Sequence, residues 1–121
     1  MGGAVTDAGS PADLDVCHLT TTGRHTGRPH RIEIWFALGD GVAYLLAGGG
    51  NRSDWVRNLM ISPQVVMEIG DAKRTTVARV VTDPDEDALA RRLVLEKYTP
   101  RYRDDLADWG RPSLPIAIAW T

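Results

Sequence analysis

The chain has 121 residues, which suits one domain with its own core and leaves no room for a second. Apolar residues make up 43% of it and the formal net charge is −2, which disfavours a surface that coats nucleic acid. No apolar run approaches a membrane span, and the single Cys17 excludes an internal disulfide. We expect a cytoplasmic protein with no stable membrane anchor and no nucleic-acid partner, in which a flexible tail over 1–12 precedes one domain over 13–121.

Alternating hydrophobicity and turn residues predict mainly β structure in the first half of the chain. A strand is expected over Leu14–Thr22, followed by a polar loop over Gly23–Gly27. The clearest strand covers His30–Leu38, where apolar and polar residues alternate. The turn Gly39–Gly41 then returns the chain over Val42–Ala47, and such a short turn makes the two strands antiparallel neighbours.

The next part of the chain carries a short helix and a second hairpin. Three glycines, Gly48–Gly50, end the preceding strand. A short helix with a serine or asparagine cap is expected over Asp54–Met60. Beyond it, Gln64–Gly70 and Lys73–Thr82 predict two antiparallel strands joined by a tight turn.

The last third combines helices with one more strand. A cap at Asp83 followed by proline and acidic residues begins a helix that runs to about Tyr98. A short helical segment is expected over Arg103–Asp108, and a final strand over Leu114–Trp120, with Pro115 at a sheet edge or near the strand's first residue. About six mostly antiparallel strands with two or three short helices favour a mainly β (α+β) small barrel over a doubly wound sheet.

The first candidate site is the run Thr20–Pro29. A loop bracketed by glycines exposes backbone N–H groups, while threonine hydroxyls and the nearby Arg24, Arg28 and Arg31 add donors and positive charge. Such a loop can hold a phosphate or a carboxylate. A polar hairpin turn with solvated arginines explains the same residues.

The second candidate site is the run Gly48–Leu59. Glycines before a helix let a ligand approach the backbone, and the helix start offers free N–H groups to an anion. Arg52 lies at that start and Arg57 about one turn further on. Because three glycines at a strand end are costly to order, we favour a functional role for them. Trp55 is explained more simply as part of the buried face of an amphipathic helix.

No acid–base or metal-binding set of residues is evident. His18, His25 and His30 have no metal-ligand spacing, so no metal is expected. Trp35 lies on the more polar face of its strand, where it could stack on a planar ring or pair across strands in solvent. The lack of a catalytic constellation is typical of reactions in which a cofactor carries the chemistry.

Taken together, the motifs resemble the deazaflavin (F-420)-dependent nitroreductase family. The run Leu19–Pro29 resembles its first signature, and Gly49–Leu59 followed by Pro63 and Val65 resembles its second. The ending Trp109–Ile116 is similar to the family's last strand. The resemblance implies a split β-barrel related to the pyridoxamine phosphate oxidases, and an enzyme that passes a hydride from reduced F-420 to a quinone, a nitroaromatic or an activated alkene.

The two loops and the resemblance together predict the site residues. The expected cofactor-binding residues are Arg24, His25, Thr26, Gly27, Gly49, Gly50, Asn51, Arg52, Ser53, Trp55, Arg57 and Asn58. Trp35, Tyr98 and Tyr102 are expected on the substrate side, and no catalytic side chain is assigned because the cofactor carries the hydride. Arg24 is expected to touch the anion directly, so that its loss weakens binding without changing stability. His25 stands where a lysine is common in the family.

Two other functions fit the same residues. One is an FMN-binding oxidoreductase with the same barrel, and the other is a non-catalytic protein that stores a cofactor or a lipophilic ligand. F-420 is expected to bind more tightly than FMN, and NADPH poorly, because the chain lacks a dinucleotide fingerprint. The apolar fraction of so short a chain is also compatible with a homodimer.

Overall fold

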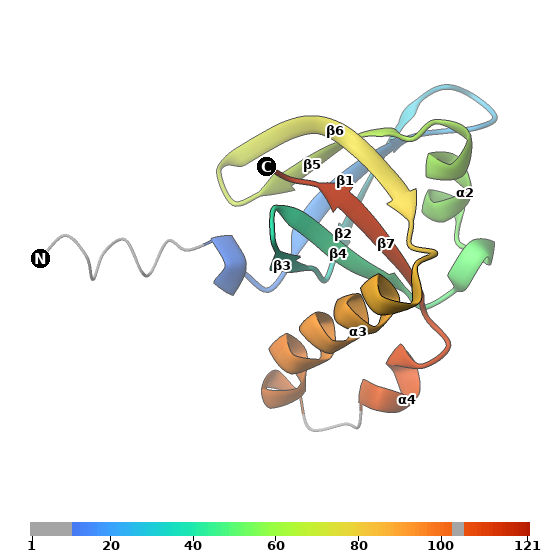
Figure 1. Ribbon diagram of the computed structural model, residues 1–121. Helices are drawn as coiled ribbons and strands as arrows, with labels where there is room; N and C mark the ends of the chain where they lie inside the picture. Colours follow the sequence, from blue (N-terminus) through green and yellow to red (C-terminus); the bar gives the residue numbers. More distant parts are fainter. Residues whose placement is uncertain (1–10, 103–105) are drawn as a thin grey trace, which may run out of the picture.

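One strongly curled sheet dominates the computed structural model, which describes residues 11–102 and 106–121 (Figure 1). Within those residues seven strands lie in the order β2-β1-β5-β6-β7-β4-β3, and each neighbouring pair is antiparallel. The strands are β1 (Cys17–Thr22), β2 (Pro29–Ile34), β3 (Ala37–Gly39), β4 (Val42–Ala47), β5 (Gln64–Ile69), β6 (Ala72–Val80) and β7 (Leu114–Ala119). The predicted split β-barrel is confirmed, with one strand more than the expected six.

The additional strand comes from a break that the sequence pattern conceals. The single strand predicted over His30–Leu38 is wrong, because its two halves pair with different partners: β2 with β1, and β3 with β4. These halves form the two opposite edges of the sheet, yet only Trp35 and Phe36 join them. Two residues span a few ångströms, so the edges must come together. This connection obliges the sheet to curl into a barrel.

A tyrosine hydroxyl holds this break in place. The backbone N–H of Phe36 donates to Tyr98 Oη at 3.0 Å, and Tyr98 Oη lies 2.6 Å from the carbonyl oxygen of Asp15, to which it donates. Lys97 Nζ donates to the Phe36 carbonyl oxygen at 2.9 Å. Burial raises the pKa of Tyr98 to about 12, so the hydroxyl keeps its proton and remains a donor. Polar backbone groups that the ladders leave unpaired are thereby satisfied.

The helix α3 (Pro84–Tyr98) carries that tyrosine and is fixed at both ends. At its start Asp83 accepts a hydrogen bond from the backbone N–H of Glu86, as the predicted cap requires. The Glu86 carboxylate accepts hydrogen bonds from Tyr44 Oη at 2.9 Å and from both terminal guanidinium nitrogens of Arg79 at 2.7 Å. These contacts tie the first turn to β4 and β6 and set the helix direction.

Strand β4 is buried on both faces and separates two cores. Ala43 and Leu45 point into the barrel, where they pack with Leu19 and Ile118 among others. The alternate residues of β4 pack outward against α3, in a second core that includes Tyr98. Cys17 is fully buried inside the barrel, and this burial raises the pKa of its thiol to about 12, so it is unsuited to act as a nucleophile.

The remaining segments complete the barrel. The helix α2 (Asp54–Ile61) contacts β1 and β6 at one end of the barrel, while α4 (Leu106–Gly110) lies beside α3 (Figure 1). Strand β7 lies between β6 and β4, so of the two positions expected for Pro115 the sheet edge is excluded and the one near the strand's first residue is confirmed: Pro115 is the second residue of β7. Short 3-10 turns are η1 (Pro11–Asp13), η2 (Gly50–Arg52) and η3 (Thr99–Arg101).

Two predicted segments fall partly outside the described residues. Residues 1–10 of the expected tail and residues 103–105 of the expected short helix belong to neither described range. No helix within residues 11–102 and 106–121 is both long and apolar enough to cross a membrane.

The Tyr98 hydroxyl yields the first prediction. Tyr98→Phe leaves the Phe36 N–H buried without its acceptor, so the free energy of unfolding should fall by about 1–3 kcal/mol. Tyr102→Phe is the matched control, because that side chain is 44% exposed and its loss should cost no more than about 0.5 kcal/mol. Urea denaturation measures both, and equal stability of the two variants would contradict the role of the hydroxyl.

Candidate functional site

The two sequence motifs meet at a pocket of about 430 Å³. It lies between the β1–β2 loop, the inner face of β2 and the start of α2. Its lining residues are Gly23, Arg24, His25, Thr26, His30, Ile32, Asp54, Trp55 and Asn58. A volume of this size lies in the usual range for small-molecule sites. The structure thus brings together five of the twelve predicted cofactor-binding residues in one cavity.

The β1–β2 loop is a closed turn as well as a pocket wall. The backbone N–H of Gly23 donates to the Arg28 carbonyl oxygen at 2.8 Å, and the N–H of Gly27 donates to the Gly23 carbonyl oxygen at 2.8 Å. Gly27 has φ of +74°, a conformation that favours glycine. A Cβ on Gly23 would lie 2.6 Å from Nε2 of His30, so only glycine lets that imidazole lie across the turn.

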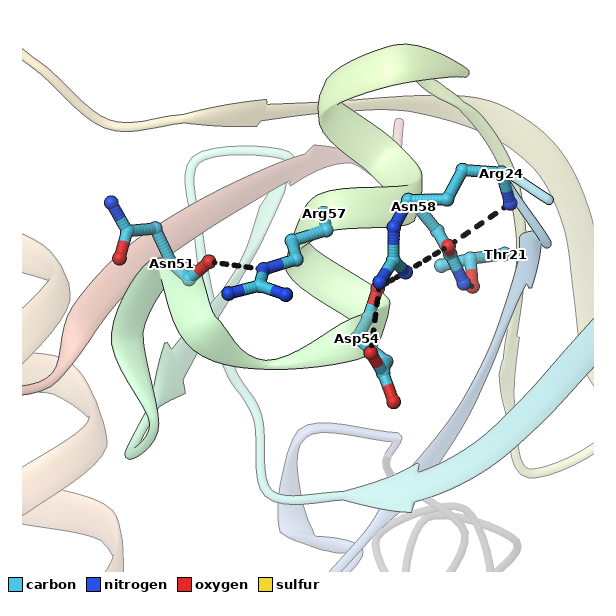
Figure 2. A network of polar contacts seen from close by, with 6 residues as sticks. All are labelled: Thr21, Arg24, Asn51, Asp54, Arg57 and Asn58. Atoms are coloured by element: carbon cyan, nitrogen blue, oxygen red, sulfur yellow. Dashed lines mark hydrogen bonds and ion pairs between the residues drawn. The ribbon is translucent and has the colours of Figure 1, made fainter.

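A buried asparagine connects this loop to α2 (Figure 2). Asn58 Oδ1 accepts hydrogen bonds from the Arg24 backbone N–H at 3.2 Å and from the Arg24 guanidinium at 2.9 Å. Its Nδ2 donates to Thr21 Oγ1 at 3.2 Å. Since Asn58 is 4% exposed, these partners satisfy a side chain that burial would otherwise penalise. Asn58 therefore fixes the distance between the two motifs.

Arg24 takes part in this connection instead of pointing freely into the pocket. Its guanidinium also pairs with the Asp54 carboxylate at 3.1 Å, and its side chain is only 16% exposed. The charge of Arg24 is thus offset by Asp54, and both of its terminal guanidinium nitrogens donate hydrogen bonds inside the protein. The sequence led us to expect an effect of Arg24 on binding alone, whereas these contacts predict that its loss also lowers stability.

The glycine-rich second motif supports the backbone around the pocket. Gly50 has φ of +58°, and a Cβ on Gly49 would lie 2.5 Å from Ser53 Oγ. Arg57 Nε donates to the Asn51 carbonyl oxygen at 3.1 Å, on the opposite side of α2 from Arg24 (Figure 2). The predicted residues outside the pocket lining are Gly27, Gly49, Gly50, Asn51, Arg52, Ser53 and Arg57. Arg52, Asn51 and Arg57 are solvent-exposed.

The predicted substrate-side aromatics form one cluster. The Trp35 ring stacks on Tyr98 with centroids 4.3 Å apart and lies 4.8 Å from the Tyr102 ring. Tyr98 is fully buried, so it supports Trp35 from behind and is not itself open to a ligand. Trp109, which the sequence did not identify for this role, packs edge-on to Trp35 at 5.4 Å and approaches Gly48 of the glycine motif.

Four residues that line the pocket were not among the predicted site residues: Gly23, Asp54, His30 and Ile32. For the last two the sequence contained a signal. His30 and Ile32 are two positions apart on β2, opposite Thr21 and Leu19 of β1. The alternation of the strand places all four on the inner face of the barrel. The alternation thus indicated that His30 lies on the same face as Ile32. A polar residue on an otherwise apolar face can indicate a site, and we did not assign His30 to one from the sequence. Among the described residues, no group of three His, Cys, Asp or Glu could hold a metal ion.

The pocket fits a phosphorylated, planar cofactor. Ile32 and the half-buried Trp55 provide apolar walls for a ring system, while His25, Thr26 and His30 provide polar groups at the loop side. This combination of apolar surface and a few convergent polar groups is what small-molecule sites present. Fold and pocket together define a split-barrel protein with a small-molecule cavity between the β1–β2 loop, β2 and α2.

Comparison with known proteins gives the family. The model of the F420H2-dependent quinone reductase family matches residues 3–120, and the chain belongs to this family. An F420H2-dependent quinone reductase of Mycobacterium tuberculosis is 32% identical over 105 residues, which cover 83% of this chain and 69% of that protein. The chain is therefore an F-420-dependent reductase, and coenzyme F-420 is its cofactor.

Solved structures agree on the fold. An F420-H2 Dependent Reductase (FDR-A) superposes with a TM-score of 0.68 at 21% identity, covering 86% of this chain and 92% of that one. A chain described as a domain-swapped dimer superposes with a TM-score of 0.70 at 21% identity, covering 96% of this chain and 91% of that one. At these identities the likeness concerns the fold.

The contacts of Arg24 yield the second prediction. Arg24→Ala removes the side-chain hydrogen bonds to Asp54 and Asn58, so the free energy of unfolding, measured by urea denaturation, should fall by about 1 kcal/mol. F-420 affinity should fall in the same variant, because the loop loses its position against α2. Arg28→Ala is the control, since Arg28 is exposed on the same loop. A tenfold affinity loss with unchanged stability would instead make Arg24 a direct ligand.

Proposed function

We propose that this protein transfers a hydride from reduced F-420 to a small organic acceptor, most simply a quinone, with nitroaromatics and activated alkenes as further acceptors. The observation that carries the proposal is the pocket in which both sequence motifs meet. The family membership supports the reductase chemistry, and the acceptor is our inference from it. We also propose that residues 13–121 act as one domain in the cytoplasm.

We expect different residues of the pocket to bind different parts of the cofactor. His25, Thr26 and Trp55 line the pocket, and we expect the first two to face the anionic part of the cofactor and Trp55 to flank its ring. The bound cofactor supplies the hydride, so the protein needs only to bind, orient and exclude water. Outside the pocket, the exposed cations Arg52 and Arg57 lie where an acidic tail could run past the start of α2.

We place the acceptor against Trp35, Tyr102 and Trp109. These rings form one aromatic cluster, in which Tyr102 and Trp109 are inclined to Trp35 by 34° and 68°, and Tyr102 is 44% exposed. Aromatic side chains stack favourably on planar ligands such as quinones. The close approach of Trp109 to Gly48 connects this surface to the second cofactor motif.

Cofactor selectivity provides the third prediction. In fluorescence titrations F-420 should bind more tightly than FMN, and NADPH should bind poorly. The protein should then catalyse the oxidation of reduced F-420 by members of a panel of quinones, each of which takes up the hydride, and the absorbance of the cofactor reports the reaction. Equal affinity for FMN would favour an FMN-binding relative, and tight F-420 binding without turnover would favour a cofactor store.

A homodimer is a separate proposal. Met60 and Ile61 at the end of α2 are 59% and 67% exposed, and Val77 of β6, the strand that α2 contacts, is 56% exposed. A solved structure of the same fold is described as a domain-swapped dimer. Exposed apolar residues of this kind are typical of interfaces. Light scattering at micromolar concentration should show a dimer, and a monomer only would refute this proposal.

A further inference from the structure

Four ionisable side chains line the pocket, and two of them, both histidines, have no ionic partner among the described residues. Arg24 and Asp54 line the cavity but neutralise each other at 3.1 Å. His25 and His30 line it too, both are exposed, and neither has an ion pair within the described part of the chain. An anion that enters the cavity therefore meets these two imidazoles.

Other charged groups near the two histidines do not face the cavity. Arg31, which follows His30, pairs with Glu68 at 2.9 Å on the outer face of the sheet. Arg28 is exposed on the far side of Gly27 and does not line the pocket. From β1 the facing residue is the uncharged Thr21, and from α2 the charged facing residue is Asp54.

We propose that His25 and His30 form a proton-linked anion site that takes the phosphate or carboxylate part of the cofactor. This inference rests on the proposed cofactor pocket and adds to it a residue, His30, and a dependence on pH. Histidine is the side chain that ordinarily changes charge near neutral pH. When both imidazoles are protonated they add two positive charges beside the neutral Arg24–Asp54 pair. When they are neutral, the anion meets only the Arg24–Asp54 pair, whose two charges offset each other.

The direction of the effect follows from the charges. An anion held by imidazolium groups favours their protonated form, so cofactor binding takes up protons and strengthens as pH falls. A charge-assisted hydrogen bond is worth about 1.5–3 kcal/mol, or roughly tenfold to a hundredfold in affinity. A lysine or arginine at the same positions would stay charged, so binding would then hold through alkaline pH.

The decisive experiment measures the dissociation constant of oxidised F-420 by fluorescence near pH 6 and near pH 8. The wild-type protein should bind at least about tenfold more tightly at the lower pH. In the double variant His25→Gln/His30→Gln the ratio of the two dissociation constants should become smaller. Only the part that comes from ionisation of the cofactor itself should remain, because that part is the same for every variant. His25→Lys and His30→Arg should keep tight binding at the higher pH.

His18→Gln is the matched control, because it removes the third histidine of the chain from the outer face of β1, where it lies 3.5 Å from Glu33. This variant should keep the wild-type ratio. The deazaflavin riboside, which has neither phosphate nor acidic tail, should show no histidine-dependent change. A derivative with the phosphate but without the acidic tail shows which anion the two histidines hold. If they hold the phosphate, this derivative keeps the pH dependence of binding; if they hold the tail, it loses it.

The outcomes separate this inference from the proposed function. If the wild-type protein binds no F-420 at either pH, the cofactor pocket itself is wrong. If it binds F-420 and the folded double variant keeps the full ratio, only the histidine pair is refuted. Thermal melting checks that the variants fold, and His25→Gln alone remains informative should His30→Gln disturb packing on Gly23.

Discussion

The hydroxyl of Tyr98 holds the point at which one half of the barrel passes into the other. The chain leaves one edge of the sheet at Ile34 and begins the opposite edge at Ala37, so the backbone of Phe36 belongs to neither ladder. Tyr98 accepts from its N–H, and Lys97 donates to its carbonyl oxygen. Without such partners, two buried backbone groups would lose their hydrogen bonds, and the short connection that curls the sheet would be costly.

The curl determines where the functional site lies. It turns the inner face of β2 toward the start of α2, and the cavity forms between them. Asn58 then fixes the width of the mouth, because its amide binds both Thr21 of β1 and Arg24 of the loop. Positioning of this kind suits a reductase whose hydride comes from a bound cofactor, since the protein's main task is then to hold cofactor and acceptor in the reactive geometry.

Sequence reasoning succeeded where structure is determined locally. The Gly39–Gly41 turn, the Asp83 cap and the glycine-bracketed loop carry their own turn and cap chemistry. It failed where partners distant in the sequence determine the structure. Apolar and polar residues keep alternating from β2 into β3, so the pattern does not show that the two strands are separate. The roles of Tyr98 and Arg24 depend on partners 62 and 34 positions away, which no local pattern reveals. The candidate site was found because its motifs are local, while His30 was missed because its role depends on the cavity that it faces.

We propose that F-420 binds in the cavity between the β1–β2 loop and α2, and the roles proposed for its binding residues depend on this position. The most direct test is a titration of ¹⁵N-labelled protein with oxidised F-420, followed by two-dimensional NMR. Binding in this cavity should give the largest shifts at the backbone of Gly23–Thr26 and at the Asn58 side-chain amide, with small shifts on the outer face at Thr20 and Val66. Large shifts on that outer face, with the loop and Asn58 unchanged, would contradict it.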